Sequence, residues 1–456
     1  MRFRRFIATL VFLGGLPLLA AAAPPAGGTD IAAVPGDISP GAIPLDLETA
    51  LECTLRNNPA LVAQRQNIQV SAEAIEVAKR FPTSLNPTLS VEVCPWVFQR
   101  GPGGAMDRLD NFITVNWAQP IELGGRRALR ENIARASYSQ TTWNLMQAEL
   151  TALVQTFRLH QTATYRREKL AVAGRLVEFN EHLLAALRRQ MDANQVSAAD
   201  VVLADVESQA TQQQRETARQ EYVAALTELR TQIGMPQYAA LAEPAGPLRV
   251  PHGELPAGED ELVQLAIEGR PEIKAAGAQV AAAREALRLA RADRIPTPSI
   301  GPAYERSETK ESFYGISASS PIPILNSGAT LVRQREAEYC RDCVALEQMR
   351  QQVTTQVKAS LVKWTQAQQS AARVQARFEP IHVQGDRMQR LYEAGQADLV
   401  KLLQVRQRWL EADNAQLDAV WQTTQAYADL LAALGVSQLL GSLPVKGEPA
   451  ATGPQR

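Results

Sequence analysis

The chain has 456 residues, with 47 basic and 48 acidic side chains and a formal net charge of −1. This balance gives no basic surface of the kind that binds nucleic acid, and no nucleic-acid partner is predicted. Aromatic residues make up only 5% of the chain, which is low for a set of compact cores. Long stretches rich in Ala and Gln instead predict extended helices that pack through small side chains.

Residues 1–23 have the pattern of a secretory signal peptide. Arginines at the start are followed by an apolar run, Ile7–Leu19, and then by four alanines. A retained membrane anchor is the alternative, and it is disfavoured because the run is short and broken by glycine and proline. The first cysteine is Cys53, so no lipid modification is expected. The sequence thus predicts an exported protein with a flexible lead over residues 24–44.

Residues 45–236 predict a helix, a β-hairpin and two further helices. Apolar residues recur with helical spacing up to Arg80, and the spacing then changes to alternation over the hairpin, residues 86–122, which has a Gly-rich turn at Gln99–Asp110. A proline-free helical run follows from residue 126 to about 191. About 65 residues at 1.5 Å each give roughly 100 Å of helix, more than a single globular core needs. After a break at Asp192–Ala198, a further helix is predicted from about residue 199 to 233.

The same plan returns in residues 259–436, after a Pro-rich connector over residues 237–258. Pro380 interrupts the second long helical run, so a kink is expected there. The tail, residues 437–456, is predicted to be disordered. The elements of this second unit are a helix over residues 260–294, a hairpin over 297–324, a long helix to 393 and a last helix over 398–434.

Matched residues recur at nearly constant spacings. The spacing falls by ten inside the hairpin, so the first copy carries about ten extra residues around Arg100–Gly104. An insertion at a β-turn, with the helices kept in step, indicates a duplicated helix–hairpin–helix–helix unit. The spacings are 212 for Pro59 and Pro271, 211 for Pro87 and Pro298, and 201 for Pro120 and Pro321, Gln195 and Gln396, and Gly234 and Gly435.

No stretch after the signal peptide reaches 18 uncharged apolar residues, so a membrane span would have to be made of strands. Open sheet edges are not tolerated in lipid, and the four strands of one chain are too few to close a sheet. Several chains would therefore have to pool their strands, with the helices forming a tube. Ordinary hairpins on a soluble core are the alternative.

Three short motifs point to a family. They are Gln119–Gly125 followed by two arginines, Ser320–Asn326, and the helix break Tyr392–Leu399. In order and spacing they resemble the TolC-type outer-membrane efflux factors over nearly the whole mature chain. The first motif is similar to the junction of the heavy-metal-efflux (CzcC/CusC-like) branch.

This resemblance implies a mainly α fold with a small membrane β-barrel portion. It implies a homotrimer in the outer membrane, with a trimeric α-helical barrel as a periplasmic tunnel and a twelve-stranded β-barrel to which each chain gives four strands. It also implies docking of an inner-membrane pump, of RND or ABC type, through a periplasmic adaptor protein.

The resemblance assigns roles to three sets of residues. The helix breaks are periplasmic tips, and their docking candidates for the adaptor are Gln195, Val196, Gln396 and Ala397, which could equally be plain turn residues. Turn positions just inside the tips line the closed aperture and are often acidic in the family; here they are Asp200, Lys401 and Gln404. A closing pair of Asp200 with Lys401 is therefore expected in place of an acidic ring. The barrel-to-tunnel junctions are Pro120, Gly124, Gly125 and Pro321.

No catalytic, cofactor or metal site is predicted. The four histidines are too dispersed for a local metal site. Cys340 and Cys343 lie within a helical run, where a strained disulfide and paired free thiols remain alternatives. The expected function is a passive duct that exports metal ions or small molecules. The alternatives are a duct for type I polypeptide secretion and a non-channel coiled-coil scaffold or adaptor.

Overall fold

The computed structural model describes residues 44–94, 97–100, 106–109, 112–235, 243–246, 248, 258–307, 309–394, 396 and 398–435. The predicted signal peptide, the lead apart from Pro44, most of the connector and the tail from residue 437 lie outside these residues. The chain divides into two units, and nearly all of the described residues belong to the larger one, Leu45–Gln237 with Pro244–Arg456.

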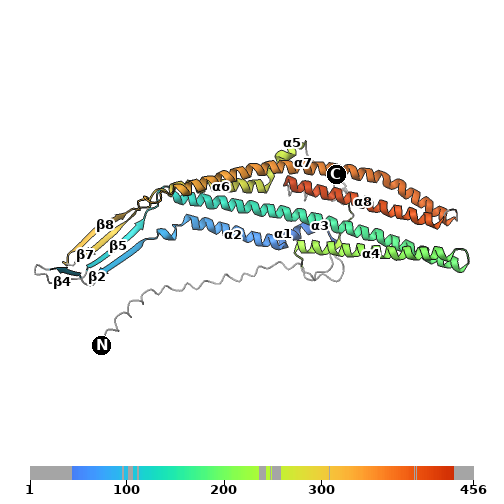
Figure 1. The fold of residues 1–456 in the computed structure, drawn as a ribbon, viewed down its shortest axis with the longest axis horizontal. Helices are drawn as coiled ribbons and strands as arrows, with labels where there is room; N and C mark the ends of the chain where they lie inside the picture. The colour runs from blue at the N-terminus through green and yellow to red at the C-terminus, as the bar shows by residue number, and fades with distance from the viewer. Residues whose placement is uncertain are drawn as a thin grey trace, which may run out of the picture. The chain divides into compact units, whose positions relative to one another are not determined.

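The larger unit contains two copies of the same series of elements, as the sequence predicts (Figure 1). The first copy consists of α1 (Leu47–Asn57), α2 (Pro59–Lys79), β2 (Thr88–Cys94), β5 (Phe112–Pro120), α3 (Arg126–Asp192) and α4 (Ala198–Ile233). The second consists of α5 (Glu259–Gly269), α6 (Pro271–Ala292), β7 (Ser299–Arg306), β8 (Ser312–Ser319), α7 (Ala329–Glu393) and α8 (Leu399–Leu434).

The first helix of each copy is divided in two, which corrects the expected single helices. The breaks fall at Asn58 and Arg270, each followed by proline. A residue before proline avoids the helical conformation, and proline is favoured at the first position of a new helix. Asn58 also caps α2, because its Oδ1 accepts hydrogen bonds from the N–H groups of Ala60 and Leu61 at 3.0 and 3.3 Å.

The segment Gln99–Asp110, expected to be a turn, contains a further strand pair. β3 (Val97–Arg100) pairs antiparallel with β4 (Met106–Leu109), while residues 101–105 lie outside the described part. Continuing the ladder satisfies backbone N–H and C=O groups that a long loop would leave to water. The first hairpin is therefore longer than expected by the pair β3 and β4.

The two hairpins join in one antiparallel sheet with the order β2-β5-β7-β8. Val93 lies opposite Ile113 in the first hairpin, and Tyr304 lies opposite Tyr314 in the second. Val93 and its counterpart Tyr304 are 211 residues apart, and Ile113 and its counterpart Tyr314 are 201 apart, which are the spacings found in the sequence. The register therefore places one set of largely apolar side chains on a common face: Leu89, Val91, Val93, Ile113, Val115, Trp117, Ile300, Pro302, Tyr304, Tyr314, Ile316 and Ala318.

The contact between the hairpins depends on a glycine. A Cβ atom at Gly301 would lie 1.9 Å from the carbonyl oxygen of Trp117, so only glycine lets β7 approach β5 this closely. This contact joins the two copies within one sheet.

The helices pack in the predicted manner, with the short helices lying along the long ones. α2 and α4 contact α3, while α6 and α8 contact α7, and α3 also contacts α6 and α8 (Figure 1). The main core lies where the short helices meet, and includes Phe157, Val357 and Leu431. α7 continues through Pro380 without interruption, and the kink stays a prediction. Among the described residues, no helix is long and apolar enough to cross a membrane.

Candidate functional site: the strand-to-helix junction and the helix tips

The predicted junction is a tight turn between β5 and α3. Pro120 is the last residue of β5, and Gly124 and Gly125 adopt φ angles of +77° and +67°, which glycine allows at little cost. A Cβ atom at Gly124 would also lie 3.2 Å from Ile295 Cδ1 of the second copy. In the second copy β8 ends at Ser319, and Pro321 lies two residues beyond the strand.

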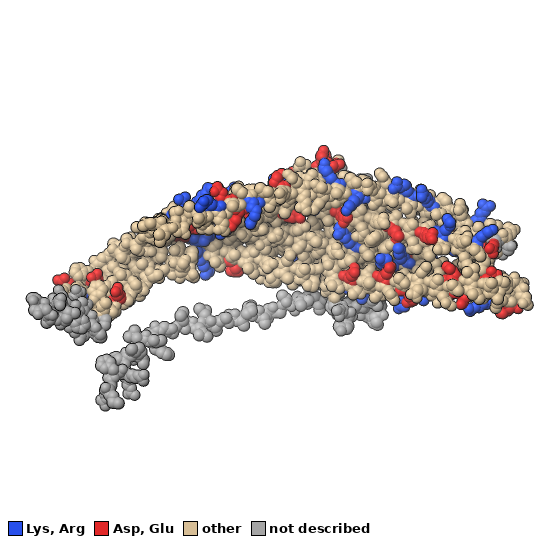
Figure 2. Space-filling view, viewed as in Figure 1, with Lys and Arg blue, Asp and Glu red and all other residues tan. Residues whose placement is uncertain are grey.

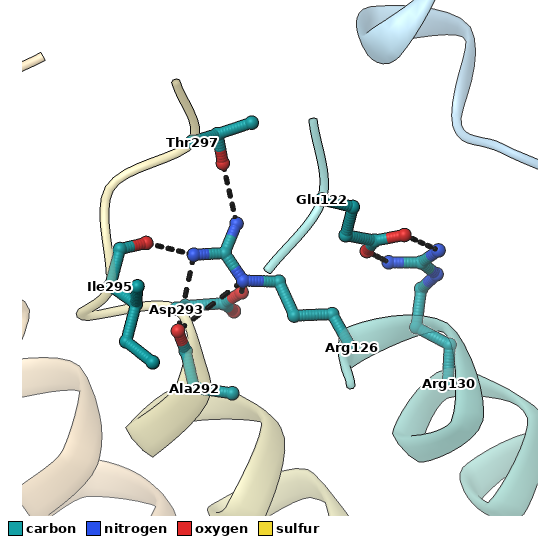
Figure 3. A network of polar contacts seen from close by, with 7 residues as sticks. All are labelled: Glu122, Arg126, Arg130, Ala292, Asp293, Ile295 and Thr297. Atoms are coloured by element: carbon teal, nitrogen blue, oxygen red, sulfur yellow. Dashed lines mark hydrogen bonds and ion pairs between the residues drawn. The ribbon is translucent and has the colours of Figure 1, made fainter. Parts of the chain in front are cut away.

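Arg126, the first residue of α3, ties the two copies together at this junction (Figure 3). Its buried guanidinium donates to the Ala292 carbonyl at 3.1 Å, to the Thr297 hydroxyl at 2.7 Å and to the Ile295 carbonyl. It also forms an ion pair with Asp293 at 3.2 Å. Ala292 ends α6, so Arg126 supplies positive charge and donors where a helix leaves its carbonyls without partners.

A second arginine holds the turn itself. Arg130, one helical turn further along α3, forms a two-pronged hydrogen bond with Glu122, whose side chain is nearly buried (Figure 3). The Glu122 carboxylate raises the pKa of Arg130. A bidentate pair of this kind fixes orientation as well as distance. Arg126 and Arg130, with their acidic partners Glu122 and Asp293, therefore form an ionic clasp at the junction.

The motif around Gly125 includes Arg126, but the sequence does not predict the role of this side chain. Its partners lie 166 to 171 residues away in the chain. The two glycines and two arginines of this motif carry no signal for such distant contacts.

The tips are two matched helix ends. The N–H of Gln195 donates to the Gln190 carbonyl, and that of Gln396 donates to the Leu391 carbonyl, both at 2.9 Å. Both glutamines are exposed, whereas Val196 is half-buried. Ala397 lies outside the described residues. The two docking candidates with exposed side chains thus occupy equivalent positions in the two copies.

A small apolar cluster, the tip cluster, holds the two tips together. Its buried members are Leu184, Leu187, Val201, Ala204 and Leu399, with Val196 and Tyr392 packed against them. Burial raises the pKa of Tyr392, and the carboxylates of Asp200 and Asp398 add to this effect. The phenol of Tyr392 therefore stays neutral beside acidic groups.

The aperture candidates do not pair with one another within one chain. The Asp200 carboxylate accepts from the Ser197 hydroxyl at 2.9 Å, in the cap of α4. Lys401 and Gln404 are exposed on α8. Between the described side chains of this single chain there is no Asp200–Lys401 ion pair, so pairing across copies stays a prediction.

Apart from Cys340 and Cys343, the side chains that could ligate a metal are dispersed in the part of the chain that is described. No group of three or more His, Cys, Asp or Glu side chains able to hold a metal ion occurs there. Cys340 and Cys343 are free thiols, as are Cys53 and Cys94. Of the two alternatives for the Cys340–Cys343 pair, the structure has the paired thiols.

The family model described as outer membrane efflux protein matches residues 262–436, nearly all of the second copy. Together with the fold, this match confirms the predicted resemblance to the TolC-type outer-membrane efflux factors. The match covers less than half of the chain and makes its second copy similar to the outer membrane efflux proteins, a class of channels.

Individual relatives agree with this class. The pyoverdine export outer membrane protein OpmQ of Pseudomonas aeruginosa is 24% identical over 415 residues, covering 86% of this chain and 85% of the relative. The outer-membrane channel OprN has a TM-score of 0.69 and 18% identity, over 85% of this chain and 89% of its own. CusC has a TM-score of 0.68 and 17% identity, over 86% of this chain and 93% of its own. Since CusC is no closer than OprN, the heavy-metal-efflux branch stays a prediction.

Proposed function

We propose that the chain is the outer-membrane duct of a tripartite efflux system and carries small molecules or metal ions out of the cell. The observation that carries this proposal is the sheet of four strands with one apolar and one polar face. Leu89, Val91 and Val93 are all more than half exposed, although they lie on the apolar face. A soluble scaffold would leave this face in water, at a cost of about 25 cal/mol per Å².

The two faces suit a wall between lipid and water. The apolar side chains would contact lipid, and Thr88, Ser90, Glu92, Thr114 and Asn116 on the other face would line an aqueous lumen. Strands β2 and β8 are the edges of the sheet. Edges are not tolerated in lipid, which supports assembly of a homotrimer in which each edge meets that of another copy.

The exposed tips support docking of a periplasmic adaptor. Gln195 and Gln396 present amide groups on turns that are fixed by backbone hydrogen bonds. A fixed turn binds a partner without a large entropy cost. The adaptor would connect the duct to an inner-membrane pump of RND or ABC type.

The cargo is proposed as a small molecule, with metal ions included. OpmQ is described as exporting pyoverdine, and the first junction motif is similar to the heavy-metal branch. Both suggestions concern small solutes. The fold offers no observation that favours polypeptide secretion over them.

The test is deletion of the gene and complementation on a plasmid. The deletion strain is expected to become more sensitive to at least one metal ion or small toxic compound in a panel, and the wild-type gene restores resistance. The double variant Gln195→Asp/Gln396→Asp is expected to reach the outer membrane but not to restore resistance. Gln213→Asp, an exposed change on α4 away from the tip, is the control. A deletion strain with unchanged sensitivity and unchanged export would contradict the proposal.

A further inference from the structure

Two cysteines of α7, Cys340 and Cys343, lie beside each other on one face of the helix. Side chains three residues apart in an α-helix are neighbours, with about 5–6 Å between their Cβ atoms. Both are free thiols, and Cys340 is exposed while Cys343 is half-buried. The other two cysteines, Cys53 and Cys94, lie on α1 and β2. The pair on α7 therefore offers two neighbouring thiols, one of them open to solvent, outside the junction and the tips.

The first copy has hydroxyl groups where the second has these thiols. The spacing of 201 residues holds at the first residues after the sheet and again at the tips, so it also matches the positions of α3 and α7 between them. The tyrosine before the pair is kept, while both thiols replace hydroxyls of similar size. Packing of a long helix at this place therefore does not require sulfur. The matched residues are Tyr138 and Tyr339, Ser139 and Cys340, and Thr142 and Cys343.

The segment that carries the pair is anchored to α6. The Asp342 carboxylate is buried, accepts a hydrogen bond from Gln279 Nε2 of α6 at 3.1 Å and forms an ion pair with Arg341 at 2.7 Å. The Tyr339 hydroxyl donates a hydrogen bond to the Cys343 sulfur. A donor of this kind orients a ligand atom and stabilises the negative charge that the atom carries when it binds a metal. The two thiols thus lie on a fixed segment, and one of them is already oriented.

Charged side chains of both signs gather over the parts of α6 and α7 that are nearest the sheet (Figure 2). Two of the basic ones lie around the pair: Arg341 stands between the two cysteines in the chain, and Arg284 of α6 lies close enough to Tyr339 to act on its charge. Two thiolates that bind one monovalent cation leave a single negative charge. These guanidinium groups are placed to compensate that charge.

The spacing along the helix favours a metal bridge over a disulfide. A disulfide has a sulfur–sulfur bond of about 2.05 Å and needs Cβ atoms about 3.5–4.5 Å apart. A regular helix holds the Cβ atoms of such a pair about 5–6 Å apart, so a disulfide would distort α7. A metal ion between the sulfurs replaces that one bond by two bonds of about 2.3 Å each, the length found for zinc and thiolate. The longer bridge fits the helix as it stands.

We propose that Cys340 and Cys343 form a two-thiolate site for a soft metal ion, with Cu(I) as its probe. Thiolates select soft ions, whereas a structural zinc ion takes four ligands, and no group of three or more His, Cys, Asp or Glu side chains able to hold a metal occurs among the described residues. On binding, each thiol loses its proton and each sulfur forms one bond to the ion, without change of oxidation state. The site does not depend on the proposed duct function.

The test is competition for Cu(I) between the purified full chain, reduced and in detergent without air, and the coloured chelator bicinchoninate. The wild-type chain is expected to remove one Cu(I) per chain from the chelator. The double variant Cys340→Ser/Cys343→Thr, which carries the side chains of the first copy, should remove none at the same concentrations. Cys53→Ser/Cys94→Ser should bind as the wild type does. An unchanged midpoint of thermal unfolding shows that each variant is folded.

A second variant tests the arrangement around the pair. Tyr339→Phe removes the donor to the Cys343 sulfur and is expected to weaken Cu(I) binding about tenfold while the stoichiometry stays at one. Tyr138→Phe, at the matched position of the first copy, should change nothing. Equal losses from both changes would overturn the role of Tyr339.

Two results would overturn the site itself. One is equal Cu(I) binding by the wild-type chain and by Cys340→Ser/Cys343→Thr. The other is isolation of the wild-type chain with the two sulfurs already joined, seen by mass spectrometry as protection of both cysteines from alkylation before reduction. Because binding is measured on the purified chain, its failure leaves the duct function standing, and an unchanged sensitivity of the deletion strain leaves the metal site standing.

Discussion

The two ends of the long helices are held in different ways. At the junction, the buried Arg126 makes directional, charge-assisted contacts with the other copy. At the tips, the two copies meet through a small set of aliphatic side chains. Charged hydrogen bonds define one geometry, whereas hydrophobic contact is non-directional and tolerates several. The junction contacts therefore define one geometry between the copies, whereas the packing between the tip helices, whose turns are themselves fixed, tolerates more than one.

The largest expected effect comes from a substitution in the sheet, next to the junction. Gly301→Val would place a side chain against the Trp117 carbonyl, where a Cβ atom already meets an oxygen at 1.9 Å. We expect destabilisation by at least about 3 kcal/mol. The measurement is the midpoint of thermal unfolding of the purified protein in detergent. Gly315→Val is the control, since its Cβ atom meets nothing within 4 Å; equal losses from both changes would contradict the role of Gly301.

The clasp should come next. Arg126→Gln removes a charged donor from the Ala292 and Ile295 carbonyls and leaves Asp293 without its partner, and should cost about 3 kcal/mol. The same thermal measurement applies. Arg127→Gln, at the exposed neighbouring position, should cost less than about 0.5 kcal/mol. A comparable loss from both arginines would show that charge near the junction matters, rather than the contacts of Arg126.

Much of the fold can be predicted from the sequence because the chain is duplicated, and each element found in one copy can be compared with its counterpart in the other. The spacings of 211 and 201 come from prolines, glycines and a glutamine, and the strand partners Val93–Ile113 and Tyr304–Tyr314 obey them. The helix breaks at Asn58 and Arg270 are not predicted because the apolar spacing continues across them, and proline is compatible with a first helical turn.

The sites follow from the sequence only in part. The turns with Gly124 and Gln195 have local signals, since their conformations depend on nearby residues. The partners of Arg126 are set by packing between distant segments, and no local pattern encodes such contacts. Comparison of the two copies adds only that this arginine is not repeated, because Ser327 stands at the spacing of 201 residues from Arg126.

A smaller effect is expected at the tips. Leu187→Ala removes a side chain that is 1% exposed and should weaken the tip cluster by about 2–3 kcal/mol. The loss should be local, because the main core and the clasp are unchanged. Hydrogen exchange of the amides in residues 184–204 should become faster, with no change near Arg126. Val202→Ala, at an exposed position of α4, is the control, and faster exchange at both ends would contradict independent tips.

The smallest expected effect is a dependence of stability on pH. It concerns His160, which lies on α3 between the junction and the tips. His160 is buried on α3, its Nε2 lies 3.0 Å from the Leu45 carbonyl, and burial lowers its pKa below the ordinary value of 6.5. The folded chain therefore keeps His160 neutral, with Nε2–H as the donor. The unfolded chain binds the proton first, so stability is present above pH 6.5 and is lost as pH falls towards the folded pKa, by at most about 1.4 kcal/mol per pH unit.

His160→Gln should flatten this acid dependence while keeping a donor for the Leu45 carbonyl, whereas His182→Gln, an exposed change on the same helix, should leave it unchanged. Unfolding midpoints between pH 7.5 and 5 measure the difference. The neutral His160 ring makes one hydrogen bond, to the Leu45 carbonyl, and glutamine can replace it. The expected result is therefore a smaller slope of the unfolding midpoint against pH, rather than a large loss of stability at neutral pH. An unaltered slope in His160→Gln would mean that carboxylates at the tips or the clasp dominate the acid response.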